Sequence, residues 1–199
     1  MPRLSLTDFV DVVSTSGLPK STKVSQIKHR ETYHPAFDFY KPLRDHIVDI
    51  HRLNQSKTAL SGILERLTDQ KKNDAYTSLV TAYRSWWGRK TLTWFDPPSG
   101  LYASSGVEVS INPELGLQIN GSQHLIKLYF KAESLSKNRV DVITHLMAKT
   151  LNGRCPSDTK MAVLDIRNAK LITPTVPIPT LDATLNAELA YIANIWLNI

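Results

Sequence analysis

The sequence predicts an α/β (α+β) protein, with a helical N-terminal half followed by an antiparallel β-meander between flanking helices. Two observations lead to this prediction. Apolar residues recur at helical spacing up to residue 87, and from residue 91 they alternate with polar residues, as in half-buried strands. The length of 199 residues suits one domain with a sizeable core. We therefore expect a single domain made of a helical subregion over 1–70, an α/β core over 71–173 and a C-terminal helix over 180–199.

Helices in the N-terminal half are predicted from caps and from apolar spacing. Ser5 and Asp8 have the spacing of a capping box, which predicts the start of a short first helix. Leu43, Ile47 and Ile50 lie on one stripe of an amphipathic helix that we expect to begin near residue 37. Further helices are predicted over 57–67 and 71–87, and the stretch 20–30 is predicted to be a loop or a short helix.

Strands and their turns are predicted in the second half. Asn120-Gly121 is typical of a two-residue hairpin, so the runs on either side should pair antiparallel. Two prolines make the stretch 96–100 unable to donate a regular ladder of hydrogen bonds. Strands are predicted over 91–95, 107–111, 115–119, 124–133, 161–167 and 170–173, with helices over 138–151 and 181–197.

The strand over 124–133 has two distinct faces, because side chains alternate along a strand. Ile126, Leu128 and Phe130 are expected on the core face. The same register puts the apolar residues of the neighbouring strands there too, namely Val107, Val109, Ile111, Leu115, Leu117 and Ile119.

The opposite face of this strand carries Lys127, Tyr129 and Lys131. Two lysines around a tyrosine can bind phosphates and stack on a base, as sheet surfaces do when they hold single strands. The alternative is a solvated face on which the lysines pair across strands with carboxylates, namely Glu108, Glu114 and Glu133.

The charge of the chain permits an anionic partner such as DNA or RNA. The net charge is +6, the isoelectric point is about 9.4, and the excess of cations lies within residues 1–160. A basic run supplies four further candidate nucleic-acid contacts: Lys20, Lys23, Lys28 and Arg30. They would act together with Lys127 and Lys131 only if the fold brings the two groups together. The alternative is that the run is a solvated linker.

Targeting signals and common catalytic motifs are missing from the sequence. Charged residues interrupt every apolar run, so we expect a cytoplasmic protein without a membrane partner. The single cysteine, Cys155, fits a reducing compartment and is expected to be an incidental thiol. No phosphate-binding loop, dinucleotide fingerprint or serine-hydrolase motif is present.

The order helix, three-stranded meander, helix, strand over 71–167 resembles the αβββαβ core of the PD-(D/E)XK nuclease superfamily. In that family an acid on the second strand and an acid-x-lysine on the third hold a divalent metal. The resemblance implies Glu114 and Lys127 as catalytic residues, with Glu114 and Glu108 as ligands of Mg²⁺ or Mn²⁺. The third strand reads Leu125-Ile126-Lys127 and Tyr129-Phe130-Lys131, so neither lysine has an acid at the required spacing. Asp141 or Asp165 could substitute.

Two segments also resemble a family of uncharacterised bacterial proteins: Phe37-Asp38-Phe39-Tyr40-Lys41-Pro42-Leu43-Arg44 and Ile126-Lys127-Leu128-Tyr129-Phe130-Lys131-Ala132-Glu133. This likeness supports one continuous unit and implies no function.

Three functions follow as hypotheses. The leading one is a nucleic-acid-associated protein with a nuclease-like core that has lost its catalytic carboxylates and needs no cofactor. The second is a structural or regulatory module without enzymatic activity that binds a protein partner through an exposed apolar patch at Phe37, Trp196 or Ile199. The third is a metal-dependent nuclease that uses Mg²⁺ or Mn²⁺.

Overall fold

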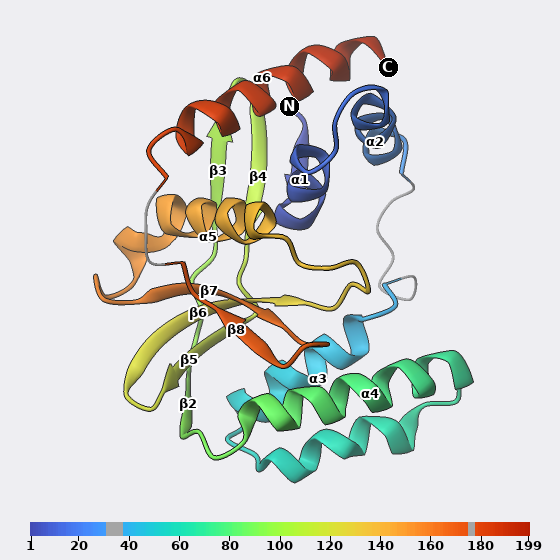
Figure 1. Ribbon diagram of the computed structural model, residues 1–199, viewed down its shortest axis with the longest axis vertical. Helices are drawn as coiled ribbons and strands as arrows, with labels where there is room; N and C mark the ends of the chain where they lie inside the picture. Colours follow the sequence, from blue (N-terminus) through green and yellow to red (C-terminus); the bar gives the residue numbers. More distant parts are fainter. Residues whose placement is uncertain (31–37, 175–177) are drawn as a thin grey trace.

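The computed structural model describes residues 1–30, 38–174 and 178–199 (Figure 1). Helices and two mixed sheets make up the chain, which confirms the predicted α/β class. The predicted beginning of the third helix near Phe37 lies outside the described residues.

The N-terminal segment contains a strand and two helices. β1 (Arg3–Ser5) leads directly into α1 (Leu6–Val13). The hydroxyl of Ser5 accepts a hydrogen bond of 3.0 Å from the Asp8 N–H, so the predicted cap is confirmed. The basic stretch forms α2 (Leu18–Lys28), with a proline in its first turn, where a missing N–H costs nothing.

Three helical elements cover one face of the larger sheet (Figure 1). They are α3 (Lys41–Arg52), the 3-10 helix η2 (Lys57–Arg66) and α4 (Gln70–Trp87). The helix predicted over 57–67 thus winds more tightly than its apolar spacing indicated. Gly88 ends α4 with a φ of 52°, which favours glycine.

The larger sheet has five strands in the order β2-β5-β6-β7-β8. Asn120 and Gly121 both have positive φ and join β5 to β6, as the hairpin signal predicted. β6 and β7 are parallel, and α5 (Lys137–Leu151) crosses between them. The strands are β2 (Leu92–Phe95), β5 (Leu115–Ile119), β6 (Ser122–Tyr129), β7 (Lys160–Asp165) and β8 (Lys170–Ile172).

The smaller sheet changes the predicted meander. β4 (Val107–Ile111) was expected to pair with β5, but it pairs with β1 and with β3 (Gly100–Ser104). A tight turn at Ser105-Gly106 brings β3 against one edge of β4, and the parallel strand β1 takes the other. Both edges of β4 are therefore occupied, and β5 pairs with β2 instead.

Two hydrophobic clusters flank the larger sheet. Ile126, Leu128 and Phe130 pack toward α3 and α4, together with the apolar residues of β5, as predicted. Val107, Val109 and Ile111 belong to the other cluster, with α1, α5 and α6, so their predicted placement on the same face was wrong. The cause is the assignment of β4 to the separate sheet.

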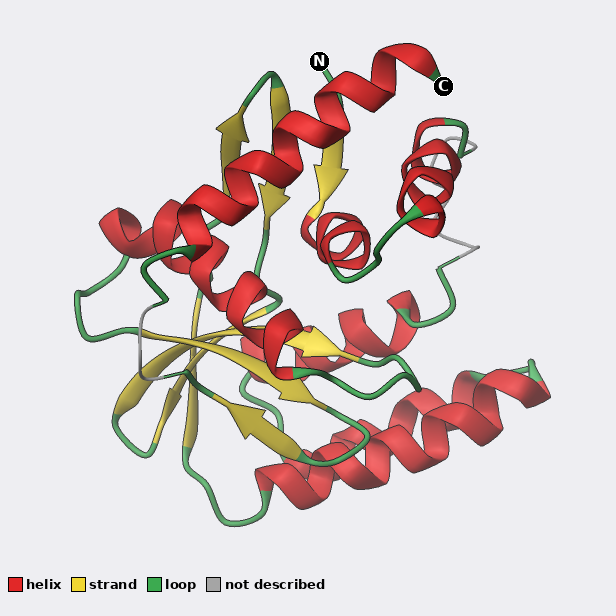
Figure 2. Ribbon diagram, turned by 45° about the horizontal axis from the view of Figure 1, so that its top comes forward, coloured by secondary structure: helices red, strands yellow, loops and turns green. Residues whose placement is uncertain are grey.

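The C-terminal helix completes the upper part of the molecule. After η3 (Asn152–Arg154) and the last strands, α6 (Leu181–Asn198) lies across the smaller sheet (Figure 2). Its apolar stripe of Leu185, Leu189 and Ile192 is fully buried in the cluster with α1 and α5. Within the described ranges, no helix has both the length and the apolar character needed to cross a membrane.

Candidate functional site

A large cavity lies at the carboxyl end of β6, between α1 and the beginning of α3. Its volume is about 1160 Å³. Ligand sites in α/β folds commonly lie at the carboxyl ends of parallel strands, and β6 is such a strand. We call this cavity the central cleft; its charged and aromatic lining consists of Asp8, Asp11, Arg30, Asp38, Tyr40, Arg44, Glu114, Lys127, Tyr129, Phe130, Lys131 and Arg139.

Glu114 and Lys127 form an ion pair in this cleft. The Lys127 ammonium lies 2.5 Å from Glu114 Oε1 and also donates to the Asn112 carbonyl at 3.1 Å. Glu114 Oε2 accepts a hydrogen bond of 2.8 Å from the Leu128 N–H. Only 11% of the Lys127 side chain and 13% of the Glu114 side chain are exposed. Both carboxylate oxygens therefore have a donor, and the pair is largely shielded from water.

Asp11 of α1 binds two cations, one from the segment that follows β6 and one from the first turn of α5. β6 ends at Tyr129, so Lys131 lies just beyond the strand that was predicted to continue to residue 133. Lys131 Nζ lies 2.5 and 2.6 Å from the two carboxylate oxygens of Asp11, and Arg139 donates to this carboxylate at 2.7 Å. Burial alone would raise the pKa of Asp11, but the hydrogen bonds and charges of Lys131 and Arg139 outweigh it and lower that pKa. Arg139, which is 7% exposed, also donates to both carboxylate oxygens of Glu133 at 3.0 and 3.1 Å.

Two further ion pairs lie along the cleft, one from each half of the molecule. Arg30, at the end of the basic run, binds both oxygens of Asp8 at 2.8 and 3.2 Å, while half of its side chain stays exposed. Arg44 of α3 donates to Asp38 at 2.8 Å. The lining described here thus holds five cations and four carboxylates, which leaves a small positive excess.

Aromatic rings complete the cleft. Tyr40 stacks on Phe130, with ring centroids 5.3 Å apart and planes 12° from parallel. Arg167 donates to the Tyr40 hydroxyl and to the Phe130 carbonyl, which holds the two rings in place. Tyr129 is buried, which raises the pKa of its hydroxyl, and that hydroxyl donates to the Glu133 carbonyl at 2.8 Å.

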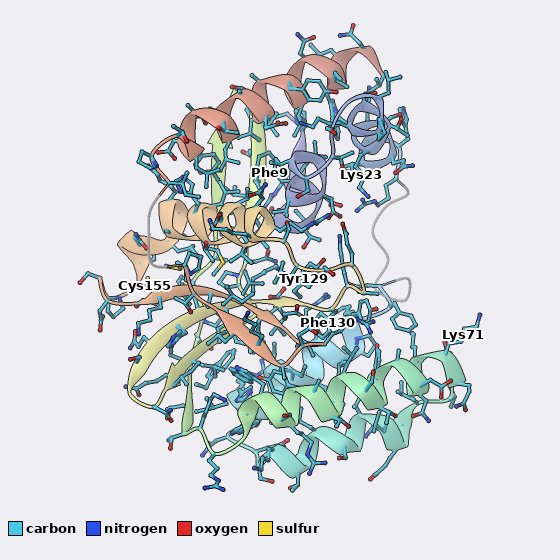
Figure 3. All side chains as sticks on the ribbon, in the orientation of Figure 1. Phe9, Lys23, Lys71, Tyr129, Phe130 and Cys155 are labelled. Carbon is cyan, nitrogen blue, oxygen red and sulfur yellow. The ribbon has the colours of Figure 1, made fainter. Side chains whose placement is uncertain are left out.

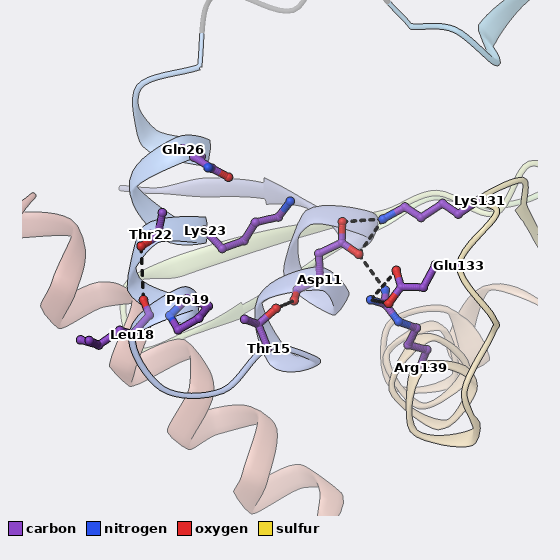
Figure 4. Close-up of a pocket in the computed structure, with 10 residues that line it drawn as sticks. All are labelled: Asp11, Thr15, Leu18, Pro19, Thr22, Lys23, Gln26, Lys131, Glu133 and Arg139. Carbon is purple, nitrogen blue, oxygen red and sulfur yellow. Dashed lines mark hydrogen bonds and ion pairs between the residues drawn. The ribbon is translucent and has the colours of Figure 1, made fainter.

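A second cavity of about 600 Å³ adjoins the central cleft and shares Asp11, Lys131 and Arg139 with it (Figure 4). We call it the side cavity. Lys23 and Gln26 of α2 face it from the opposite side (Figure 4). Among the described residues, Lys23 has no hydrogen-bond or ion-pair partner, so its charge is available to a ligand.

The structure brings most of the predicted nucleic-acid contacts together. Lys127, Tyr129, Lys131 and Arg30 line the central cleft, and Lys23 lines the side cavity. The alternative of a solvated face with lysines paired to carboxylates was right about the Lys127–Glu114 pair. It was wrong about solvent, because α1 and α5 cover this face and Lys127 and Tyr129 are each less than a tenth exposed. Alternation along a strand separates the two sides of a sheet but does not show what packs on them.

Two cations of the basic run lie elsewhere. Lys20 pairs with Glu188 at 2.7 Å, and Lys28 donates to the carbonyls of Trp196 and Ile199. Both therefore attach α2 to α6. Trp196 and Ile199, the expected members of an apolar patch, pack partly buried against the core, and Phe37 lies outside the described residues.

The residues implied as metal ligands are separated by the fold. Glu108 lies on β4 in the smaller sheet, whereas Glu114 immediately precedes β5 in the larger one. The alternative acids have other partners: Asp141 pairs with Lys137, and Asp165 accepts two hydrogen bonds from Asn168. Across the described parts of the chain, no three His, Cys, Asp or Glu residues are grouped so that they could hold a metal ion.

Several residues of the cleft were not expected from the sequence to belong to a site, among them Asp8, Asp11, Asp38, Tyr40, Arg44 and Arg139. Asp8 was noted only as part of a helix cap. Asp11 meets Lys131 across 120 positions of sequence, so no local pattern signals the contact. The one available signal was at Arg139, which lies on the same face of its helix as the apolar Val142 and Ile143.

The comparisons with known proteins add no family. The chain matches no protein-family model, and a comparison with curated proteins finds no match. A function for this chain can therefore be inferred only from the geometry of the two cavities.

Proposed function

We propose that this protein binds nucleic acid in the central cleft and that its nuclease-like core is catalytically degenerate. The observation that carries the proposal is the convergence of cationic side chains from the segment after α2, from α3, from β6 and from α5 around one cavity that also contains the Tyr40–Phe130 stack. Cations that follow a phosphate backbone, combined with aromatic faces for bases, are the usual components of single-strand binding sites.

The topology of the larger sheet supports the nuclease-like part of the proposal. α4, β2, β5, β6, α5 and β7 follow each other as a helix, three antiparallel strands, a helix and a parallel strand, with the β3–β4 hairpin inserted after the first strand. This order resembles the αβββαβ core of the PD-(D/E)XK superfamily, with β5 in the second place and β6 in the third. On that resemblance, Glu114 and Lys127 correspond to that family's acid and lysine.

The loss of catalysis is inferred from the partners of Glu114. A divalent cation needs free anionic oxygens, and both oxygens of Glu114 already accept hydrogen bonds, one of them from a buried ammonium. Position 125, where the family has its second acid, is a fully buried leucine. Glu114 and Lys127 therefore act as a structural pair.

A metal-dependent nuclease remains a second candidate, because Glu114 and Lys127 do converge in the cleft. It predicts cleavage of labelled DNA or RNA with Mg²⁺ or Mn²⁺ that the substitution Glu114→Gln abolishes. Cleavage by the wild-type protein that disappears in this folded variant would replace the non-catalytic proposal.

Binding is tested by fluorescence anisotropy with labelled single-stranded DNA and RNA over a series of salt concentrations. We expect the logarithm of the affinity to fall linearly with the logarithm of the salt concentration. Lys131→Ala should reduce the magnitude of that slope by about 0.7, the value for one phosphate contact on a single strand. Lys71→Ala is the matched control, since Lys71 is exposed on α4, far from Lys23 and Tyr129 (Figure 3). An equal effect of both variants, or no binding to either nucleic acid, would refute the proposal.

A further inference from the structure

Asp11 separates the two cavities and holds two cations that belong to both. Its carboxylate accepts three hydrogen bonds, two from Lys131 and one from Arg139. Cationic groups that clamp two oxygens of one planar or tetrahedral anion bind carboxylate and phosphate with the same geometry. Asp11 therefore lies where a phosphate of a bound ligand would be expected between Lys131 and Arg139.

The charges of the side cavity indicate which phosphate would fit. Three cations face it, Lys23, Lys131 and Arg139, against the two carboxylates of Asp11 and Glu133. The net charge of these groups is one positive, and the unmatched cation is Lys23, which points into the cavity from α2 (Figure 4). A phosphodiester carries a single negative charge, whereas a phosphomonoester carries about 1.5 to 2 at neutral pH. Asp11 stays in the lining on α1 after its carboxylate leaves Lys131 and Arg139, so its charge still counts, and the cavity matches an internal phosphate of a chain better than a terminal one.

We propose that the side cavity is a phosphodiester site for single-stranded nucleic acid and that Asp11 occupies it in the free protein. This inference rests on the proposed function and identifies its ligand class. The incoming phosphate displaces the Asp11 carboxylate from Lys131 and Arg139 and gains the charge of Lys23. No covalent bond changes, so the step is an exchange of one anion for another between the same donors.

The preference for a single strand over a duplex follows from the neighbouring central cleft. Because the two cavities share three residues, a strand with a phosphate in the side cavity can extend its adjacent base toward the Tyr40–Phe130 stack. An unpaired base exposes its faces for such stacking, whereas a base in a duplex is already stacked and paired. A duplex of the same sequence should therefore bind more weakly than the single strand.

The decisive variant is Asp11→Asn, which keeps the shape of the side chain and removes its charge. If Asp11 competes with the ligand, the variant should bind a labelled single-stranded oligonucleotide more tightly, by roughly two- to fivefold, the value of one partly exposed ion pair. A purely structural Asp11 gives unchanged or weaker binding. Asp74→Asn on α4 is the matched control, because Asp74 is exposed and, within the described residues, its side chain accepts a hydrogen bond only from Gln70.

Lys23→Ala provides a second variant that does not depend on the stability of the Asp11 cluster, since Lys23 has no partner in the described structure. Its binding to the oligonucleotide should weaken, and the salt slope should decrease by about 0.7. Competition with a duplex and with a nucleoside 5′-monophosphate completes the experiment, and both should displace the oligonucleotide poorly.

The outcomes separate this inference from the proposed function. Tighter binding by Asp11→Asn together with weaker binding by Lys23→Ala supports the phosphodiester site. Oligonucleotide binding that neither variant changes, or that the duplex matches, overturns this inference and leaves the proposed function standing. Failure of the wild-type protein and of Asp11→Asn to bind any of the probes overturns both.

Discussion

Removal of Lys127 should destabilise the protein strongly. Its ammonium is the cation that neutralises the Glu114 carboxylate in a site where both side chains are less than one seventh exposed. Lys127→Met keeps the length and apolar character of the side chain but leaves the buried Glu114 charge without its ion-pair partner, with the Leu128 N–H as its hydrogen-bond donor and Arg44 as a more distant cation. Breaking a buried pair from one side typically costs about 3–5 kcal/mol of unfolding free energy.

The double variant Lys127→Met with Glu114→Leu should recover most of that loss, because replacing both charges by apolar groups is often close to neutral. Urea unfolding of the wild type, both single variants and the double variant gives the coupling energy of the pair. A coupling below about 0.5 kcal/mol, or a Lys127→Met variant as stable as the wild type, would refute the structural role that we assign to this pair. Because Lys127 supports the fold, binding experiments use Lys131 and Lys23 instead.

Three further predictions concern the core and the cleft. Burial lowers the pKa of His51 to about 4, from 6.5 in the unfolded chain. Below pH 6.5 the unfolded chain binds a proton that the folded protein does not, so the free energy of unfolding should fall by about 3 kcal/mol between pH 6.5 and pH 4. His51→Gln should flatten this part of the pH profile in urea unfolding; a profile identical to that of the wild type contradicts the assignment. Gly116→Ala should lower the free energy of unfolding by about 1–3 kcal/mol, because a Cβ there would lie 2.3 Å from the Phe95 carbonyl oxygen. A urea midpoint equal to that of the wild type argues against this close approach. Tyr40→Ala should weaken oligonucleotide binding by about 1–3 kcal/mol through lost stacking, measured by anisotropy, and equal affinities would remove Tyr40 from the site.

The helices and the hairpin were predictable because their signals are local. The Ser5 cap and Asn120-Gly121 each act within a few residues, and the structure has both where the sequence placed them. The pairing of β4 was not predictable in this way. Its partners β1 and β3 are short, and β1 lies about a hundred residues away in the chain, so alternation alone could not distinguish one sheet from two.

The site could be predicted only in part, because its residues come from segments that are far apart in the sequence. Lys131 and Lys23 were identified as cations, but only the fold shows that α1 and α2 face the end of β6 and bring them to one cavity. Lys127 was identified correctly as polar and incorrectly as open to solvent, because the covering helix α5 follows it in sequence and leaves no mark on the strand itself. Asp11 is the clearest omission: an acid on the polar side of a short amphipathic helix has no evident role until Lys131 and Arg139 are seen to bind it.

The most direct test of nucleic-acid binding in the central cleft is hydrogen exchange of the backbone amides with and without a single-stranded oligonucleotide. Ligand binding slows exchange where it suppresses local opening. We predict slower exchange at the end of β6, in α1 and in the first turn of α5, with α4 unchanged as the internal control. Protection centred on α4 and η2, or no protection at saturating oligonucleotide, would contradict this account.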